Sequence, residues 1–237
     1  MQAKEQVHLM ARFGKLLQLT VLILICGTAW ASTISIAVGN PDFATPVVAC
    51  GLGYAYQGSL GCGAGVPYQD FNGTPGFDWT FGAGGNGLTG PSTNFNPPDF
   101  SGLGFSQAAF LQGGAASVSQ LLTGPAGIWA VSFYLGSRYA SGNYDGNQTV
   151  EVLLNGQNVG TYSLSSSMPF TLETTSPLTL GAGSYTLEFE GTANGDHTAF
   201  VSGVSASDQV PEPVSFGLLG AGLIGLGLLR PSRRRAA

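Results

Sequence analysis

Between residues 32 and 210, few side chains have the types and spacings that catalysis requires. His197 is the only histidine in this range, and no G-x-S-x-G, H-E-x-x-H or C-x-x-C motif occurs in the chain. The sequence therefore lacks the usual material for a serine-hydrolase triad, a zinc site or thiol chemistry. The run 82–87 matches G-x-G-x-x-G, but it lies in a Gly/Pro-rich region with no predicted helix after it, so we do not expect it to hold phosphate. These observations predict a protein that is not an enzyme.

Carboxylates are the remaining candidates for chemistry, because residues 32–210 carry eleven acidic side chains. A glycosidase or lyase that uses two of them therefore stays open as an alternative function. Glu188 and Glu190 share one face of a predicted strand, which is typical of a solvated surface. Asp42, Asp196 and Asp208 are candidate oxygen ligands for Ca²⁺ near the two ends of the predicted fold, although no EF-hand loop is present. No other cofactor is expected.

Carbohydrate binding is the interaction that the remaining polar and aromatic residues suit best. Such a surface needs an exposed flat ring that packs on the C–H face of a sugar, together with polar groups that pair with its hydroxyls. Two places in the sequence offer this combination: Arg138, Tyr139, Tyr144 and Asp145 in one predicted loop, and Asp78-Trp79 in another. An ordinary polar hairpin loop is the alternative interpretation of the first group.

The charge of the chain is distributed unevenly. Residues 32–210 contain one cation, Arg138, and eleven acids, which gives this range a net charge of −10. Such a surface repels nucleic acid and acidic polysaccharides unless Ca²⁺ bridges the two. We therefore expect no nucleic-acid partner. The other seven Lys and Arg residues flank two apolar runs near the ends of the chain.

Short strands must position these residues. Large apolar residues at 129, 131, 133 and 135 alternate with smaller or more polar neighbours in 127–135, and Trp129 is expected in the core. The run 149–154 is followed by Asn155-Gly156, a strong hairpin signal, and then by 157–164. Further short strands are predicted at 108–110, 118–122, 171–175, 185–189 and 198–204. With no sustained helical period, this spacing predicts an all-β fold, an antiparallel β-sandwich or jelly roll.

Residues 51–105 differ from the rest in composition, with thirteen Gly between 51 and 90 and several Pro among them. We expect long loops with a few strands there, where binding residues on a sandwich usually lie, and disorder of a part is the alternative. Cys50 and Cys62 are the only cysteines after residue 31. In an exported protein we expect them to form a disulfide, with two free thiols as the alternative.

The N-terminus predicts export. Three basic residues precede an apolar run at 16–25, and alanines follow at 29 and 31. This order is typical of a secretory signal peptide, and a run of about ten residues is too short to span a bilayer. We expect signal peptidase to cleave after Ala31. A start at Met10 leaves this expectation unchanged, and a lipoprotein cleaved at Cys26 is the alternative.

The C-terminus combines a short motif, an uncharged run at 214–229 and a basic end. The run is long enough for a helix of about 24 Å, a short transmembrane span. The flanking residues are Val210, Pro211, Glu212, Pro213, Arg230, Arg233, Arg234 and Arg235. This pattern resembles the PEP-CTERM sorting signal of bacteria, also known as the ice-binding-protein C-terminal domain. The resemblance implies that an exosortase cuts near Pro-Glu-Pro and passes the protein to the cell surface or the extracellular polysaccharide. A plain membrane anchor is the alternative.

The region between the two ends resembles the galactose-binding-like β-sandwich domains that PEP-CTERM proteins often carry. The likeness rests on the order of short motifs at 40–43, 78–79, 107–112, 118–120, 129–136, 150–156, 185–189 and 198–201. The resemblance implies a galactose-binding-like β-sandwich for residues 40–206. Ser202-Gly203 stand where that family commonly has an Asp–Asn pair, which puts the role of that pair in doubt here.

The sequence thus predicts a signal peptide at 1–31, an exported β-sandwich at 32–208 and a sorting signal at 209–237 with a transmembrane helix at 214–229. The expected protein is anchored in the inner membrane before it reaches the cell surface or the extracellular matrix. We expect it to be non-catalytic and to interact with extracellular polysaccharide. A protein-binding adhesin is the alternative besides the enzyme.

Overall fold

The computed structural model describes residues 32–48, 53–58, 70–91 and 95–210, and every regular element within these ranges is a β-strand. The predicted signal peptide, the residues after 210 and the expected disulfide partners Cys50 and Cys62 lie outside them. Within the described ranges, no helix is long and apolar enough to cross a membrane. The predictions for the two ends and for the disulfide therefore stay predictions.

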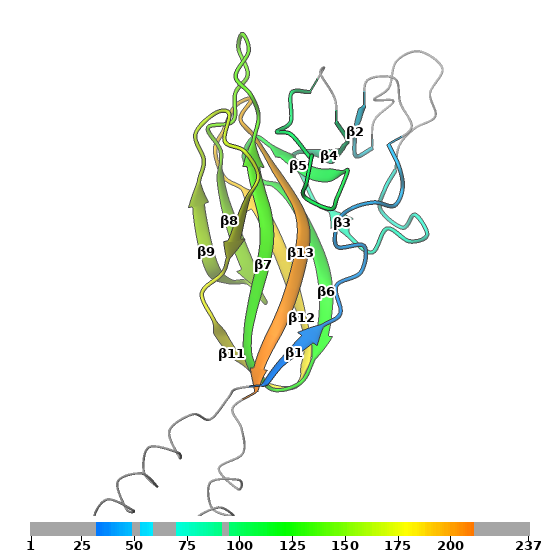
Figure 1. The fold of residues 1–237 in the computed structure, drawn as a ribbon, viewed down its shortest axis with the longest axis vertical. Coiled ribbons are helices and arrows are strands. Elements are labelled where there is room, and N and C mark those ends of the chain that lie inside the picture. The colour runs from blue at the N-terminus through cyan, green and yellow to red at the C-terminus, as the bar shows by residue number, and fades with distance from the viewer. Residues whose placement is uncertain (1–31, 49–52, 59–69, 92–94, 211–237) are drawn as a thin grey trace, which may run out of the picture. The chain divides into compact units, whose positions relative to one another are not determined.

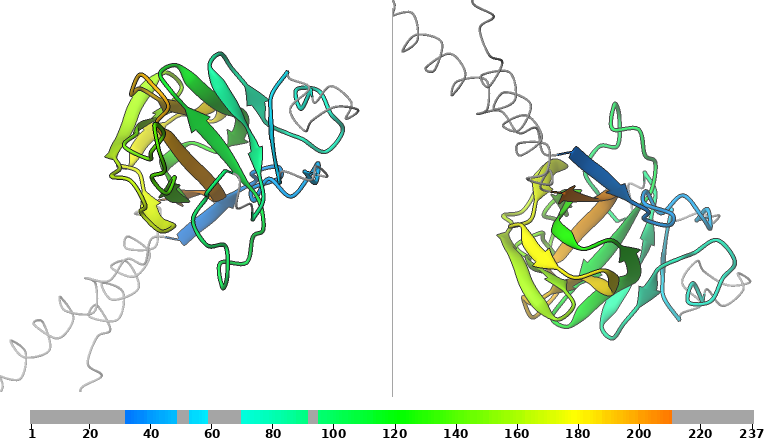
Figure 2. Two further views of the ribbon diagram at one scale, coloured as in Figure 1. Left: turned by 90° about the horizontal axis from the view of Figure 1, so that it is seen from above. Right: turned by 90° about the horizontal axis from the view of Figure 1, so that it is seen from below.

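The described strands form two antiparallel sheets (Figures 1 and 2). The larger sheet has the order β10-β7-β13-β5-β4-β2, with β1 added to β13 and β11 added to β7. The smaller sheet has the order β3-β6-β12-β8-β9. The bounds are β1 (Ser32–Ile36), β2 (Tyr54–Tyr56), β3 (Thr80–Phe81), β4 (Gly85–Thr89), β5 (Ala108–Gln112), β6 (Ala116–Gly124), β7 (Gly127–Ser137), β8 (Thr149–Leu154), β9 (Gln157–Ser163), β10 (Thr171–Thr174), β11 (Leu178–Leu180), β12 (Gly183–Gly191) and β13 (Thr198–Val210).

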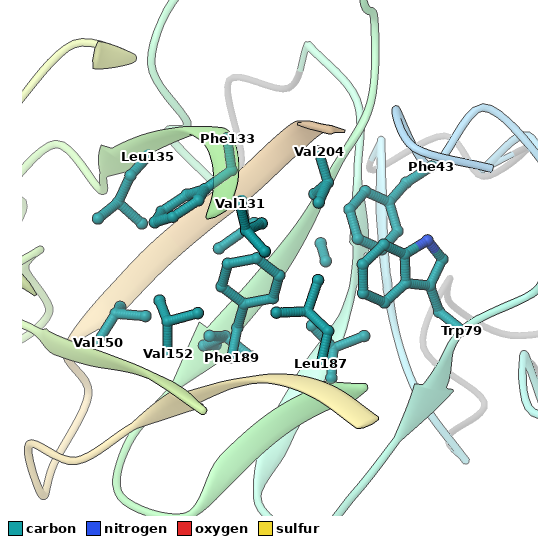
Figure 3. Close-up of a cluster of buried hydrophobic side chains, with 14 of the residues drawn as sticks. Phe43, Trp79, Val131, Phe133, Leu135, Val150, Val152, Leu187, Phe189 and Val204 are labelled. Carbon is teal, nitrogen blue, oxygen red and sulfur yellow. The ribbon is translucent and has the colours of Figure 1, made fainter. Parts of the chain in front are cut away.

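The core lies between the two sheets and follows the period-two pattern of the sequence (Figure 3). Trp129, Val131, Phe133 and Leu135 point inward from β7, as predicted, and all are fully or almost fully buried. Phe189 of β12 meets Phe133 across the core with ring centroids 4.9 Å apart. Burying an apolar side chain of this size stabilises the fold by roughly 1.5–3 kcal/mol. The all-β, antiparallel fold expected from the sequence is therefore confirmed.

The hairpin between β8 and β9 is formed as its sequence predicts. Asn155 and Gly156 have φ angles of 53° and 76°, the left-handed backbone that a two-residue type I′ turn requires. The turn fixes the pairs next to it, Leu154↔Gln157 and Leu153↔Asn158, and an irregularity between Leu153 and Val152 shifts the register by one residue for the pairs from Val152↔Gly160 to Thr149↔Ser163. This local signal was sufficient because both turn residues tolerate a positive φ.

The Gly/Pro-rich region does not form only surface loops. Phe71, Phe77, Trp79 and Phe81 are buried in the core between the sheets. The described part also contributes β2, β3 and β4, which the sequence pattern did not locate. Residues 70–91 thus form loops with two short strands, β3 and β4, as expected, but the aromatic residues of these loops are buried, because large rings gain more from burial than from exposure.

A second cluster of buried aromatic residues covers the other face of the larger sheet. Successive residues of β5 alternate between the two clusters, because Ala109 and Leu111 face the core while Ala108 and Phe110 face outward. The segment 95–105 contributes three of the phenylalanines that cover this face, at positions 95, 100 and 105. We call this set the outer aromatic cluster: Phe95, Phe100, Phe105, Ala108, Phe110, Phe170 and Phe200.

Candidate functional site

Two connections meet at one end of the larger sheet: residues 138–148 between β7 and β8, and residues 192–197 between β12 and β13. Backbone hydrogen bonds join them, since Asp145 N donates to Asp196 O at 3.1 Å and Thr198 N donates to Asp145 O at 2.9 Å. The first connection folds back on itself through a short bridge between Ser141 and Tyr144, and it extends beyond the end of β7 at the top of Figure 1. We call these two connections the loop surface.

Arg138 lies at the base of the loop surface, where β7 ends. Its guanidinium is held between the ring of Phe95, 4.4 Å from the centroid, and the ring of Tyr144, 3.8 Å away. Its Nη1 donates to Asp196 Oδ1 at 3.0 Å. The residue is only 5% exposed, so cation–π contacts and a carboxylate replace most of the water that a free guanidinium binds.

A chain of hydrogen bonds extends from Arg138 across the sheet. Asp196 Oδ1 also accepts from Gln112 Nε2, and Gln112 Oε1 accepts from Tyr56 OH. Burial, together with the nearby charge of Asp196, raises the pKa of Tyr56 above its ordinary value. The tyrosine therefore stays protonated and keeps donating over a wide pH range. The chain links β2, β5 and β7 to the loop surface.

A second polar pair, Asp145 and His197, joins the two connections of the loop surface. His197 Nδ1 lies within hydrogen-bonding distance of Asp145 Oδ1, and Asn147 donates to Asp145 from its backbone N at 2.9 Å and from Nδ2 at 2.7 Å. Partial burial acts to raise the pKa of Asp145, but the hydrogen bonds from His197 and Asn147 outweigh it and hold that pKa below its ordinary value. Asp145 is thus a carboxylate at neutral pH.

Two buried polar atoms beneath this network have no hydrogen-bond partner among the described residues. They are Nε of Arg138 and Oγ1 of Thr198. The two residues face each other across β7 and β13, because Arg138 N donates to Thr198 O at 3.1 Å. The base of the loop surface is therefore polar as well as aromatic.

The structure brings together the first group of residues predicted from the sequence. Arg138, Tyr144 and Asp145 belong to the network described above. Tyr139 lies on the same connection and is 43% exposed, while its backbone N donates to Asn96 O at 3.0 Å. Of these candidates, Tyr139 presents its ring to solvent, whereas Arg138 is covered.

The second predicted group, Asp78 and Trp79, does not form a binding surface. Trp79 is 1% exposed, and its ring stacks on Phe43 with centroids 4.9 Å apart. Its Nε1 donates to Asn40 O at 2.9 Å. Asp78 is exposed next to it. Trp79 is a core residue because the strand β3, which follows it, packs Phe81 inward and pulls the preceding aromatic ring into the same layer.

The aspartates proposed as Ca²⁺ ligands do not converge. Asp196 is paired with Arg138, Asp42 Oδ1 accepts only a long hydrogen bond of 3.4 Å from Ala44 N, and Asp208 is fully buried at the opposite end of β13. In the part of the chain that the structure describes, no group of three or more His, Cys, Asp and Glu is placed to hold a metal ion. Glu188 and Glu190 lie on the outward face of β12, with Glu151 opposite Glu190.

Several residues of the network were not identified from the sequence: Tyr56, Phe95, Gln112, Asp196 as the partner of Arg138, and His197 as the partner of Asp145. One sequence feature bears on this network. Arg138 is the only cation in residues 32–210, and a cation that is buried requires an acid and covering groups. The sequence did not reveal which acid, since Asp196 is 58 residues away.

No protein-family model matches the chain, and no curated protein matches its sequence. Solved structures with a similar fold include a Stig cyclase, Fisc, from Fischerella sp. TAU in complex with (3Z)-3-(1-methyl-2-pyrrolidinylidene)-3H-indole, with a TM-score of 0.52 and 14% identity, covering 76% of this chain and 100% of that one. The apo form of a cyclase from Fischerella sp. has a TM-score of 0.50 and 14% identity, covering 77% of this chain and 98% of that one. The likeness is one of fold. The carbohydrate-binding module CBM36 in complex with calcium and xylotriose overlaps less, with a TM-score of 0.39 and 17% identity over 55% of this chain and 94% of that one.

Proposed function

We propose that this chain is an exported, non-catalytic β-sandwich protein of the cell surface or extracellular matrix that binds glycan through its loop surface. The observation that carries the proposal is Tyr139, an exposed ring on a connection whose two sides are fixed by the Arg138 and Asp145 contacts. A connection whose backbone is already fixed loses little conformational entropy when a ligand packs on it.

The two connections of the loop surface also carry exposed polar groups of the kind that a sugar requires. Asn143 and Asn147 on the same connection and Asn194 on the neighbouring one are exposed. Amide side chains both donate and accept hydrogen bonds, and therefore suit hydroxyl groups. A few directed polar groups around an aromatic ring are the usual composition of a small-ligand site.

Export and sorting are proposed from the ends of the sequence. A signal peptide at 1–31 implies signal peptidase, and the tail at 210–237 resembles a PEP-CTERM signal and implies an exosortase. On this proposal the run 214–229 anchors the protein in the inner membrane until the tail is cut. The matrix polysaccharide outside the cell then supplies the glycan.

The binding surface is tested with single substitutions of Tyr139 in the full chain. Tyr139→Ala is expected to weaken glycan binding about fivefold or more, because one aromatic contact is worth about 1 kcal/mol. Tyr139→Phe keeps the ring and should bind like the wild type. Binding is measured on a panel of immobilised polysaccharides.

The matched control is Leu121→Ala, which removes an apolar side chain that is similarly exposed on the outward face of β6. It should leave binding unchanged. If Tyr139→Ala binds as tightly as Leu121→Ala, the loop surface is not the binding site. If no polysaccharide binds the wild type, the protein is not a glycan binder, and the adhesin alternative takes its place.

A further inference from the structure

We infer that the loop surface binds uncharged glycans and rejects acidic ones, an inference that rests on the proposed function. The exposed ring of Tyr139 points to glycan binding in general, whereas the charges of the loop surface indicate the class of glycan. The observations behind the inference are the exposure and the pairing of these charges.

The one cation of residues 32–210 is not available to a ligand. Arg138 is 5% exposed, and the rings of Phe95 and Tyr144 lie 4.4 and 3.8 Å from its guanidinium. Its Nη1 is already paired with Asp196. An arginine binds a carboxylate or sulfate of a glycan through the accessible N–H groups of its guanidinium. The guanidinium of Arg138 is covered and contacts other residues of the protein.

Negative charge, by contrast, reaches the surface. The side chain of Asp196 is 43% exposed and that of Asp145 is 27% exposed. The imidazole of His197 is 32% exposed, but its Nδ1 faces Asp145. A uronate or sulfated residue that approached the loop surface would therefore meet two carboxylates and no accessible Lys or Arg within the described residues, and like charges repel.

An uncharged glycan meets no such barrier. Its hydroxyls can donate to the exposed carboxylate oxygens of Asp196 and can pair with the amides of Asn143, Asn147 and Asn194. Its C–H faces can pack on Tyr139. Each group that the loop surface exposes thus has a partner on a neutral sugar, whereas an acidic sugar adds a charge that nothing on this surface compensates.

The inference is tested by equilibrium binding of the full chain to neutral and acidic polysaccharides, with EDTA present to remove bridging cations. Neutral probes are a β-glucan and a galactomannan, and acidic probes are polygalacturonate and alginate. The four terminal arginines are replaced by Gln in every sample, so that the tail at 230–235 does not bind the acidic probes. We expect at least one neutral polysaccharide to bind at least tenfold more tightly than either acidic one.

Adding an exposed cation to the loop surface should reduce the discrimination. Asn143→Lys is expected to strengthen binding of polygalacturonate at least fivefold at low salt, with loss of the gain at high salt because screening weakens the contact. Leu121→Lys changes the net charge equally but lies on the outward face of β6, and it should produce little gain.

The outcomes separate this inference from the proposed function. If the wild type binds an acidic polysaccharide as tightly as any neutral one, or if Asn143→Lys gains no more than Leu121→Lys, the inference is overturned while glycan binding stands. If no probe binds the wild type, both fall together.

Discussion

The two charged residues that are most deeply buried in the described ranges are accommodated in opposite ways. Arg138 has a carboxylate at Nη1 and two aromatic rings in cation–π contact with its guanidinium. Asp208 is fully buried on β13 opposite Trp129, and neither of its carboxylate oxygens has a hydrogen-bond partner among the described residues. Its carboxylate occupies space that Gly127 leaves, since a Cβ there would lie 1.8 Å from Oδ1. An unpaired buried carboxylate is costly, so Asp208 lowers the stability of this end of the sandwich.

Asp208→Val is therefore expected to raise the free energy of unfolding by about 1–3 kcal/mol, because it removes the desolvation cost and keeps a similar volume beside Val204 and Ala206. Urea denaturation with an unchanged m-value measures the gain. Asp99→Val, at an exposed position, serves as the control and should give none. A loss of stability in Asp208→Val would mean that the carboxylate makes a contact in solution that the fold requires.

At the scale of elements, β2 and β4 are strands that the sequence pattern missed and whose pairing depends on a glycine. β4 has the sequence GNGLT and lies between β2 and β5. A Cβ at Gly87 would lie 2.1 Å from Ala55 O and 2.9 Å from the ring of Phe110. The close approach of these strands, and with it the position of Tyr56 in the hydrogen-bond chain to Arg138, thus requires glycine at this position.

Gly87→Ala should destabilise the protein by about 1–3 kcal/mol, the usual range for forcing an extra methyl into a packed site. Gly90→Ala is the matched control, because its new Cβ would have its nearest neighbour, Ser106 O, at an ordinary 3.5 Å. The difference in urea midpoint between the two variants measures the effect. Equal midpoints would show that β2 and β4 can move apart without a loss of stability, and would contradict the requirement for glycine at position 87.

At the scale of the whole molecule, the sequence divides into an acidic region and two basic ends. Residues 32–210 carry a net charge of −10, whereas four arginines follow the apolar run at 214–229. If that run spans a membrane, as we propose, the arginines favour the orientation in which they stay in the cytoplasm and residues 32–210 lie outside it. On the proposed function, the two ends direct the location of the protein and residues 32–210 carry its binding surface.

The intact mass of the protein released from native cells tests this division. The released species should lack residues 1–31 and the tail after about Pro213, because signal peptidase and exosortase remove them. A Glu212→Ala variant should keep the tail, since the Pro-Glu-Pro motif is altered. A tail retained in the wild type as well would identify 214–229 as a permanent anchor.

The sequence by itself determined the features that depend on neighbours along the chain. The alternation in 127–135 predicted which residues of β7 face the core, and Asn155-Gly156 predicted the β8–β9 turn, because strand period and turn geometry are local properties. Both predictions are confirmed. The sequence also predicted that Arg138, Tyr144 and Asp145 lie near one another, since all three belong to one connection.

Only the tertiary structure decided what these residues contact. It paired Arg138 with Asp196 and Phe95, placed Trp79 in the core instead of on the surface, and laid 95–105 over the larger sheet. Each of these outcomes is a choice among distant partners of similar chemistry, set by which strands pair and which faces they bury. A glycine-rich segment has no period from which that choice can be read, because the packing of its few large side chains, and not their spacing, determines its path.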